Sequence, residues 1–210
     1  MAELSGASTR PAPQTGAEGG PPGHDVRLGW LLIGGGLAGL LAAFTLTVEK
    51  FALVADPTYV PSCSINPVVS CGSVMASAQA EMFGFPNPLL GLIGFTVVVV
   101  TGAVMLGGAR LPRWYRFGFQ AGVTFGVPFV HWLAFQSLYR IGALCPYCLV
   151  VWAVTIPVFW YVTLDNLRTW GSARPVRWVR RFHGVILTVW LLAIVVAIAV
   201  RFWSSWLLLW

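Results

Sequence analysis

The chain has 210 residues, of which 57% are hydrophobic and only 10% are charged. A soluble domain of this size would carry charge on roughly a quarter of its residues. The composition therefore excludes an ordinary soluble protein and predicts a chain that lives in a bilayer. The formal net charge of +6 is interpreted as solvated loop arginines, and no nucleic-acid site is expected.

Residues 1–26 are rich in Pro, Gly, Ala, Ser and Thr and nearly lack large apolar side chains. Such a segment cannot offset the entropy of ordering, so we predict a disordered cytoplasmic tail. A cleaved signal peptide is not expected, because no basic region opens the chain and the first apolar run is too long and begins too late.

Five uncharged apolar runs follow, and each can supply the ~20 residues that cross ~30 Å of hydrocarbon as a helix. The runs are 28–48, 82–109, 117–139, 141–164 and 182–200. They are apolar on every face, which excludes a transmembrane barrel built from alternating strands of about ten residues. The sequence therefore predicts an all-α integral membrane protein with five crossings.

Glycines recur along two of these runs. Gly35 and Gly39 share one face of the first predicted helix, and Gly118, Gly122 and Gly126 form a ladder along the third. Without Cβ atoms, such faces let membrane helices approach closely. We interpret both sets as helix-packing faces.

The arginines predict the orientation of the helices, because short positively charged loops stay on the cytoplasmic side. The connection between the second and third runs carries Arg110, Arg113 and Arg116, and residues 167–181 carry five more arginines. Both connections are predicted to be cytoplasmic. The connection 49–86 and the turn before the fourth run then face outward, which places every cysteine at the outer surface.

The chain has four cysteines, and two of them form the motif Cys145-Pro-Tyr-Cys148. If Cys145 caps a helix and Pro146 is its first residue, Cys148 lies on the same helix face as Cys145. The positive end of the helix dipole favours the thiolate, which is the form that attacks disulfides. A redox pair is the favoured interpretation, with a structural disulfide or a metal ligand pair as alternatives.

The other pair, Cys63 and Cys71, lies in a stretch of turn-forming residues within the long connection 49–86. A connection of this length is far above the usual loop length and is expected to be functional. We predict a mobile lid over the outer mouth of the bundle, with a short helix after Cys71.

A haem site and a zinc site are two alternative interpretations of the histidines and cysteines. One haem would need two histidines at the same depth, whereas His131 is predicted near the outer half of the third helix and His183 at the inner end of the fifth. His24 lies in the tail. A zinc site made by all four cysteines would need both pairs to converge on one ion, and the gap between Cys63 and Cys71 is wider than in usual zinc knuckles. No metal is predicted.

Taken together, the motifs resemble those of the vitamin K epoxide reductase family, in its bacterial branch. The resemblance covers about residues 28–166 and rests on four motifs: Cys63-x7-Cys71-Gly-Ser, Ser77, Asn87-Pro-Leu-Leu-Gly91 and Cys145-x-x-Cys148. It implies a four-helix catalytic bundle around a quinone in residues 27–166 and a basic cytoplasmic loop in 167–181. It also implies a fifth transmembrane helix in 182–210, whose end at 202–210 lies in the interface.

The resemblance implies a role for each cysteine. Cys145 and Cys148 would be the active-site pair beside the quinone, and Cys63 and Cys71 would be a disulfide-bonded shuttle pair on the loop. A reduced partner would attack the shuttle disulfide at Cys63, Cys71 would then attack Cys145, and the freed Cys148 would pass electrons to the quinone.

Four further residues are expected near the quinone. Asn87 matches the asparagine that hydrogen-bonds a quinone carbonyl, and Ser77 matches a serine near the site. Trp152 stands where the family has a tyrosine, which removes a phenolic donor for the second carbonyl. His131 is expected either beside the quinone pocket or in an interhelical hydrogen bond.

The implied activity is that of a membrane thiol:quinone oxidoreductase that supports disulfide bond formation. Its partner would be a separate exported thioredoxin-fold protein, because the chain stops at Trp210, soon after the fifth helix. The quinone would be of the menaquinone or vitamin K type rather than ubiquinone. The expected location is the bacterial cytoplasmic membrane, with the N-terminus inside and the C-terminus outside. The alternative is a vitamin K epoxide or quinone reductase that acts mainly to produce hydroquinone.

Overall fold

The structure, a computed structural model, describes residues 23–66, 68–170 and 174–203. Helices account for most of this part of the chain, which contains no β-strand and one isolated β-bridge, between Val69 and Leu144. Most of the predicted tail and residues 204–210 of the predicted interfacial segment lie outside the described residues. Residues 23–26, which the sequence assigned to the tail, begin the first helix.

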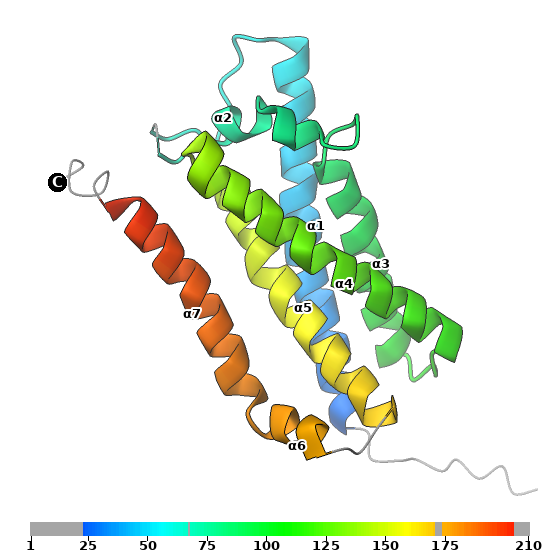
Figure 1. The fold of residues 1–210 in the computed structure, drawn as a ribbon. Coiled ribbons are helices and arrows are strands. Elements are labelled where there is room, and N and C mark those ends of the chain that lie inside the picture. Colours follow the sequence, from blue (N-terminus) through cyan, green and yellow to red (C-terminus); the bar gives the residue numbers. More distant parts are fainter. Residues whose placement is uncertain (1–22, 67, 171–173, 204–210) are drawn as a thin grey trace, which may run out of the picture.

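A long helix occupies each of the five predicted apolar runs (Figure 1). These helices are α1 (Gly23–Ala55), α3 (Pro88–Leu106), α4 (Arg113–Phe135), α5 (Pro146–Trp170) and α7 (His183–Arg201). Short helices connect them: α2 (Cys71–Met75), the 3-10 helix η1 (Ala78–Glu81), the π-helix η2 (Gln136–Ile141) and α6 (Arg174–Arg181).

Four of the long helices, α1, α3, α5 and α7, have the length and apolar composition needed to cross a membrane. The fifth, α4, has 23 residues, but Gln120 and His131 make it more polar than the others. The structure therefore supports an all-α multi-pass membrane protein. The crossing by α4 stays a prediction.

Two helix starts differ from the predicted apolar runs. The second apolar run begins at residue 82, inside the predicted connection 49–86, and α3 begins at Pro88, just after that connection. Gly84 has a positive φ of 80°, and proline suits the first helical position. The fourth apolar run begins at residue 141, whereas α5 begins at Pro146, as the Cys145-Pro146 motif predicted. There Gly142, with φ 72°, ends the preceding π-helix and turns the chain.

Close packing of α1 against α3 forms one side of the bundle, and α5 lies between α1 and α4 (Figure 1). A Cβ atom at Gly39 would overlap the ring of Phe95, and a Cβ atom at Gly102 would lie 2.9 Å from the carbonyl oxygen of Gly29. The predicted packing role of glycine is thus confirmed at Gly39 on α1, because only glycine permits this approach to α3.

The last helix, α7, lies along the outside of the bundle and mainly contacts α5. None of its residues, all of which the structure describes, is buried. Side-chain hydrogen bonds attach it: Trp190 Nε1 donates to His131 Nε2 at 3.0 Å, and Arg201 Nε donates to the Leu138 carbonyl at 2.9 Å. At its end, Phe202 is buried whereas Trp203 is exposed.

Candidate active site

The loop that carries the first cysteine pair is anchored by backbone hydrogen bonds directly before the second pair. Leu144 N donates to the Val68 carbonyl at 2.7 Å, and Ser70 N donates to the Leu144 carbonyl at 3.0 Å. The Asn66 carboxamide oxygen accepts from the amides of Val68 and Val69, which forms the turn that brings this strand-like segment into place. Because Cys71 follows Ser70 and Cys145 follows Leu144, this pairing places the two cysteines side by side.

Further upstream, the same loop is held by a buried carboxylate. Glu49, near the end of α1, accepts hydrogen bonds from the hydroxyl of Ser62 at 2.6 Å and that of Tyr59 at 3.0 Å. The predicted short helix is present as α2 and begins at Cys71 itself, where the Ser70 hydroxyl caps it by accepting from Ser73 N.

All four cysteines meet at one end of the bundle. Cys63 and Cys71 form a disulfide with a Cα–Cα distance of 5.6 Å, and Cys145 and Cys148 are free thiols. The Sγ atoms of Cys71 and Cys145 are 3.1 Å apart. Both residues are almost fully buried, at 0% and 1% exposure, in a cluster that includes Leu46 and Met75. One sulfur of the loop disulfide is therefore in contact with one thiol of the helix pair.

The predicted helix start at the second pair is confirmed, since α5 begins at Pro146, directly after Cys145. The pKa of the Cys145 thiol lies below its usual value, chiefly because the Cys148 thiol donates a hydrogen bond to it. The backbone N–H groups of Cys148 and Tyr147 act in the same direction, and the three hydrogen bonds together outweigh the opposing effect of burial on this pKa. Cys145 is therefore the more easily ionised partner in contact with the loop disulfide.

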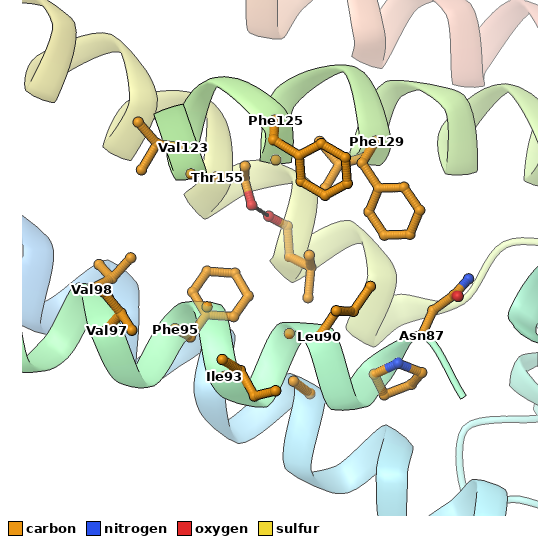
Figure 2. A pocket seen from close by; sticks show the side chains of 18 of the residues that line it. Asn87, Leu90, Ile93, Phe95, Val97, Val98, Val123, Phe125, Phe129 and Thr155 are labelled. Atoms are coloured by element: carbon orange, nitrogen blue, oxygen red, sulfur yellow. Dashed lines mark hydrogen bonds between the residues drawn. The ribbon is translucent and has the colours of Figure 1, made fainter. Parts of the chain in front are cut away.

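A cavity of about 620 Å³ extends from Cys148 down between α3, α4 and α5. Figure 2 shows Phe125 and Phe129 of α4 on one side of it and Leu90 and Phe95 of α3 on the other. The few polar groups on its wall lie mostly toward the end that holds Cys148. A largely apolar cavity with polar groups at one end suits a flat, apolar ligand that carries a polar headgroup.

Two glycines of the α4 ladder line this cavity instead of packing against a neighbouring helix. A Cβ atom at Gly118 or Gly122 would have no other atom within 4 Å, although both residues are on the cavity wall. Gly126 also lines the cavity, and its nearest neighbour is the methyl group of Thr155 at 3.7 Å. The prediction that this ladder packs helices together is therefore wrong for Gly118 and Gly122, where the missing side chains leave empty space, whereas Gly126 does contact α5.

Asn87 lies at the end of the cavity nearest the cysteines, immediately before α3 (Figure 2). Its Nδ2 donates to the Gln79 carbonyl at 2.7 Å, whereas its buried Oδ1 has no hydrogen-bond partner. An unpaired buried amide oxygen costs roughly 1–3 kcal/mol. The carboxamide also keeps a second hydrogen on Nδ2. Asn87 thus offers an acceptor and a donor to the polar end of a ligand.

Trp152 is also brought to the cavity wall, where it is 5% exposed. Its indole N–H is a donor, and it makes no hydrogen bond to any residue in the described part of the chain. Ser77, in contrast, is not on the wall. Its hydroxyl donates to the Val74 carbonyl at 2.6 Å, which closes the end of α2.

His131 is placed away from the cavity, on the face of α4 that meets α7. Its Nδ1 lies 2.8 Å from the Val127 carbonyl, and its Nε2 accepts from Trp190. Both ring nitrogens are thus engaged in hydrogen bonds. Of the two predictions for His131, the structure supports the interhelical hydrogen bond.

One residue that the sequence analysis missed is Lys50, the only lysine of the chain. It lines the cavity, is 7% exposed, and donates to the Met75 carbonyl at 2.8 Å. It also forms an ion pair of 2.8 Å with Glu81, which is half-exposed. The available signal was a charged side chain at the outer end of an apolar helix, where ionisable groups are costly and often functional.

The described residues contain no group of three or more His, Cys, Asp or Glu side chains placed to hold a metal ion.

Comparison with family models gives a match to the vitamin K epoxide reductase family over residues 30–163. The chain belongs to this family. The matched residues include all four cysteines, the residues that line the cavity and the loop that carries Cys63 and Cys71. A comparison with curated proteins finds no match. Members of the vitamin K epoxide reductase family are membrane redox enzymes that act on thiols and a quinone, generally with a thioredoxin-like partner.

Proposed function

We propose that this protein is a membrane thiol:quinone oxidoreductase that reoxidises an exported thioredoxin-fold protein and passes the electrons to a membrane quinone. One observation carries the proposal: Cys71 Sγ lies 3.1 Å from Cys145 Sγ, while Cys148 lines the cavity. The four cysteines thus form a continuous route from the loop to the apolar interior of the bundle.

The first exchange occurs at the loop. A thiolate of the partner attacks Cys63, and the Cys63–Cys71 bond breaks as a mixed disulfide forms. The second thiol of the partner then releases Cys63, so the partner leaves oxidised and both loop cysteines are reduced. Cys63 suits this step because it is 7% exposed whereas Cys71 is fully buried.

The second exchange moves the same electron pair inward. The Cys71 thiolate attacks Cys145 in the Cys145–Cys148 disulfide, and Cys148 leaves as a thiolate. Cys63 then attacks Cys71, which restores the loop disulfide and frees Cys145. The result is the arrangement in the structure, with an oxidised loop pair and a reduced pair beside the cavity.

The cavity fits a quinone by its apolar wall and by the unpaired groups at its outer end. Asn87 would bind one ring oxygen, through Nδ2 to a carbonyl or through Oδ1 to a hydroxyl, and the Trp152 N–H would donate in place of the phenol. A bound quinone accepts two electrons and two protons as the Cys145–Cys148 disulfide forms. A menaquinone-type ring is favoured by the family resemblance.

Lys50 adds a positive charge to the same end of the cavity. An ammonium group there would stabilise negative charge that develops on a ring oxygen during reduction. Glu81, which is half-exposed, connects this ammonium to solvent.

The proposed orientation has the cysteines outside and the N-terminus inside a bacterial cytoplasmic membrane. The arginine-rich α6 and the α3–α4 turn lie at the end of the bundle opposite the cysteines (Figure 1). Such an arrangement agrees with the bias of arginine toward cytoplasmic loops. It requires α4 to cross as well, which gives five spans.

The test is reconstitution of the full chain in liposomes with a reduced thioredoxin-fold protein and menaquinone. The parent is expected to produce quinol and oxidised partner in equal amounts. Cys148→Ser should produce neither above background, while Trp190→Phe, which alters only the α7 contact, should match the parent. Turnover of Cys148→Ser at the parent rate would refute the assignment of Cys148 as the electron donor.

A further inference from the structure

A second cavity, of about 580 Å³, lies at the end of the bundle opposite the cysteines. It is enclosed by the start of α1, the end of α5, α6 and the start of α7 (Figure 1). Its wall carries five arginines: Arg27, Arg168, Arg177, Arg180 and Arg181. Neither the quinone chemistry nor the cysteine relay uses this cavity.

The arginines of this second cavity lack carboxylate partners in the described part of the chain. The ion pairs found there are Lys50–Glu81 and Arg116–Asp165, and neither includes one of the five. Asp165 is the acidic residue on the cavity wall, and Arg116 already pairs with it. The cavity therefore holds an excess of positive charge that suits an anionic ligand.

A second, independent feature also indicates a ligand. His183, the first residue of α7, lines the cavity, and its Nδ1 is buried without a hydrogen-bond partner. Its ring packs edge to face against Tyr161, with a centroid distance of 5.8 Å. A buried ring nitrogen beside five guanidinium groups needs a polar atom that the described residues do not provide.

The rest of the wall distinguishes a lipid from a free anion. Leu28, Leu31 and Leu164 line the same cavity, so apolar and cationic surfaces meet within it. Trp178 on α6 is 60% exposed, as expected for an aromatic side chain at a membrane surface. A free phosphate ion would use only the charged part, whereas a phospholipid would use both.

We propose that this cavity binds one acidic phospholipid. The headgroup phosphate lies among the guanidinium groups, which bind phosphate well through paired N–H donors. A headgroup hydroxyl or phosphate oxygen meets His183 Nδ1, and an acyl chain lies against the leucines. The lipid would thereby hold α6 and α7, which have few other contacts, against α1 and α5.

The experiment uses the purified full chain in a neutral detergent, with retained lipid counted by native mass spectrometry. Phosphatidylglycerol is titrated against phosphatidylcholine of the same acyl chains, and inorganic phosphate is added as a competitor. The test variant is Arg177→Gln with Arg180→Gln. The matched control is Arg110→Gln with Arg113→Gln, which removes the same charge at the same end of the bundle but outside the cavity.

The parent should retain one phosphatidylglycerol saturably and bind phosphatidylcholine more weakly. The test variant should lose about 30-fold in affinity, at ~1 kcal/mol per arginine, while the control keeps the parent affinity. His183→Phe, which leaves every charge in place, should also weaken binding. Equal losses in the test and control variants would show diffuse attraction and overturn the proposal. So would equal binding of the two lipids, or displacement of the lipid by phosphate at the lipid's own concentration.

Discussion

Gly122→Leu should fill the cavity proposed for the quinone without harming the fold. Gly122 lies on the cavity wall, and a Cβ atom there would meet no other atom within 4 Å. The protein alone therefore has room for the leucine side chain, whereas a bound quinone would have to share that space. The substitution changes ligand binding because it fills the volume that the glycine ladder leaves empty.

The size of the expected effect on quinone binding follows from the energetic cost of overpacking. Forcing an extra side chain into an occupied apolar site costs about 1–3 kcal/mol, which corresponds to about a 5- to 150-fold rise in the KM for quinone. Thermal stability should not fall, because leucine is a better helix former than glycine by roughly 1 kcal/mol. Exchange between the partner and the loop disulfide, which does not involve the cavity, should keep its rate.

The assay measures quinol formation against quinone concentration, together with thermal unfolding. Gly34→Leu on α1 is the matched control, because its Cβ also meets nothing within 4 Å and Gly34 is exposed outside the cavity. It should leave the KM unchanged. If Gly122→Leu and Gly34→Leu gave the same KM as the parent, the cavity beside the glycine ladder would not be the quinone site.

Three further substitutions test the surroundings of the cysteines. Lys50→Met should lower stability by about 2 kcal/mol, since it leaves a carbonyl and a carboxylate without their partner. Adding Glu81→Leu removes the unpaired carboxylate and should restore part of the stability but not the quinone reduction rate. Recovery of that rate in turnover measurements would make Lys50 purely structural. Replacing Cys148 by Ala removes the main cause of the low pKa of Cys145, so the pH at which its thiolate absorbance appears should rise. Cys148→Ser keeps a donor and should shift that pH less, and identical titrations would contradict this explanation. Trp190→Phe should remove one hydrogen bond, worth ~1 kcal/mol of stability, and so lower the melting temperature modestly without changing the KM for quinone. A raised KM would place His131 in quinone binding.

Much of the helical architecture could be predicted, because each long apolar run is a local feature of the sequence. The start of α5 was predictable from Pro146, whose missing N–H costs nothing at the first helical position. Hydropathy alone would begin both α3 and α5 several residues too early, because it does not reveal the positive φ angles at Gly84 and Gly142 that precede them.

The candidate site, too, could be predicted only in part from the sequence. The proximity of Cys71 and Cys145 arises from backbone hydrogen bonds to Leu144, a pairing across more than 70 residues that no local pattern encodes. The α4 glycines look like a packing face in sequence, and only the absence of neighbours around Gly118 and Gly122 reveals their place on the cavity wall. For His131, the sequence predicts its position along the helix but not which neighbouring helix its side chain faces, so its contact with Trp190 is seen only in the structure.

The central claim is that electrons pass between the loop and the helix pair through Cys71 and Cys145. The direct measurement is disulfide mapping of the variant that combines Cys63→Ser with Cys148→Ser, in which only Cys71 and Cys145 can pair. With their sulfurs 3.1 Å apart, mild oxidation in the membrane should convert the chain almost completely to the Cys71–Cys145 disulfide, seen as one crosslinked peptide. Two thiols that stay fully open to alkylation under the same oxidation would contradict the account.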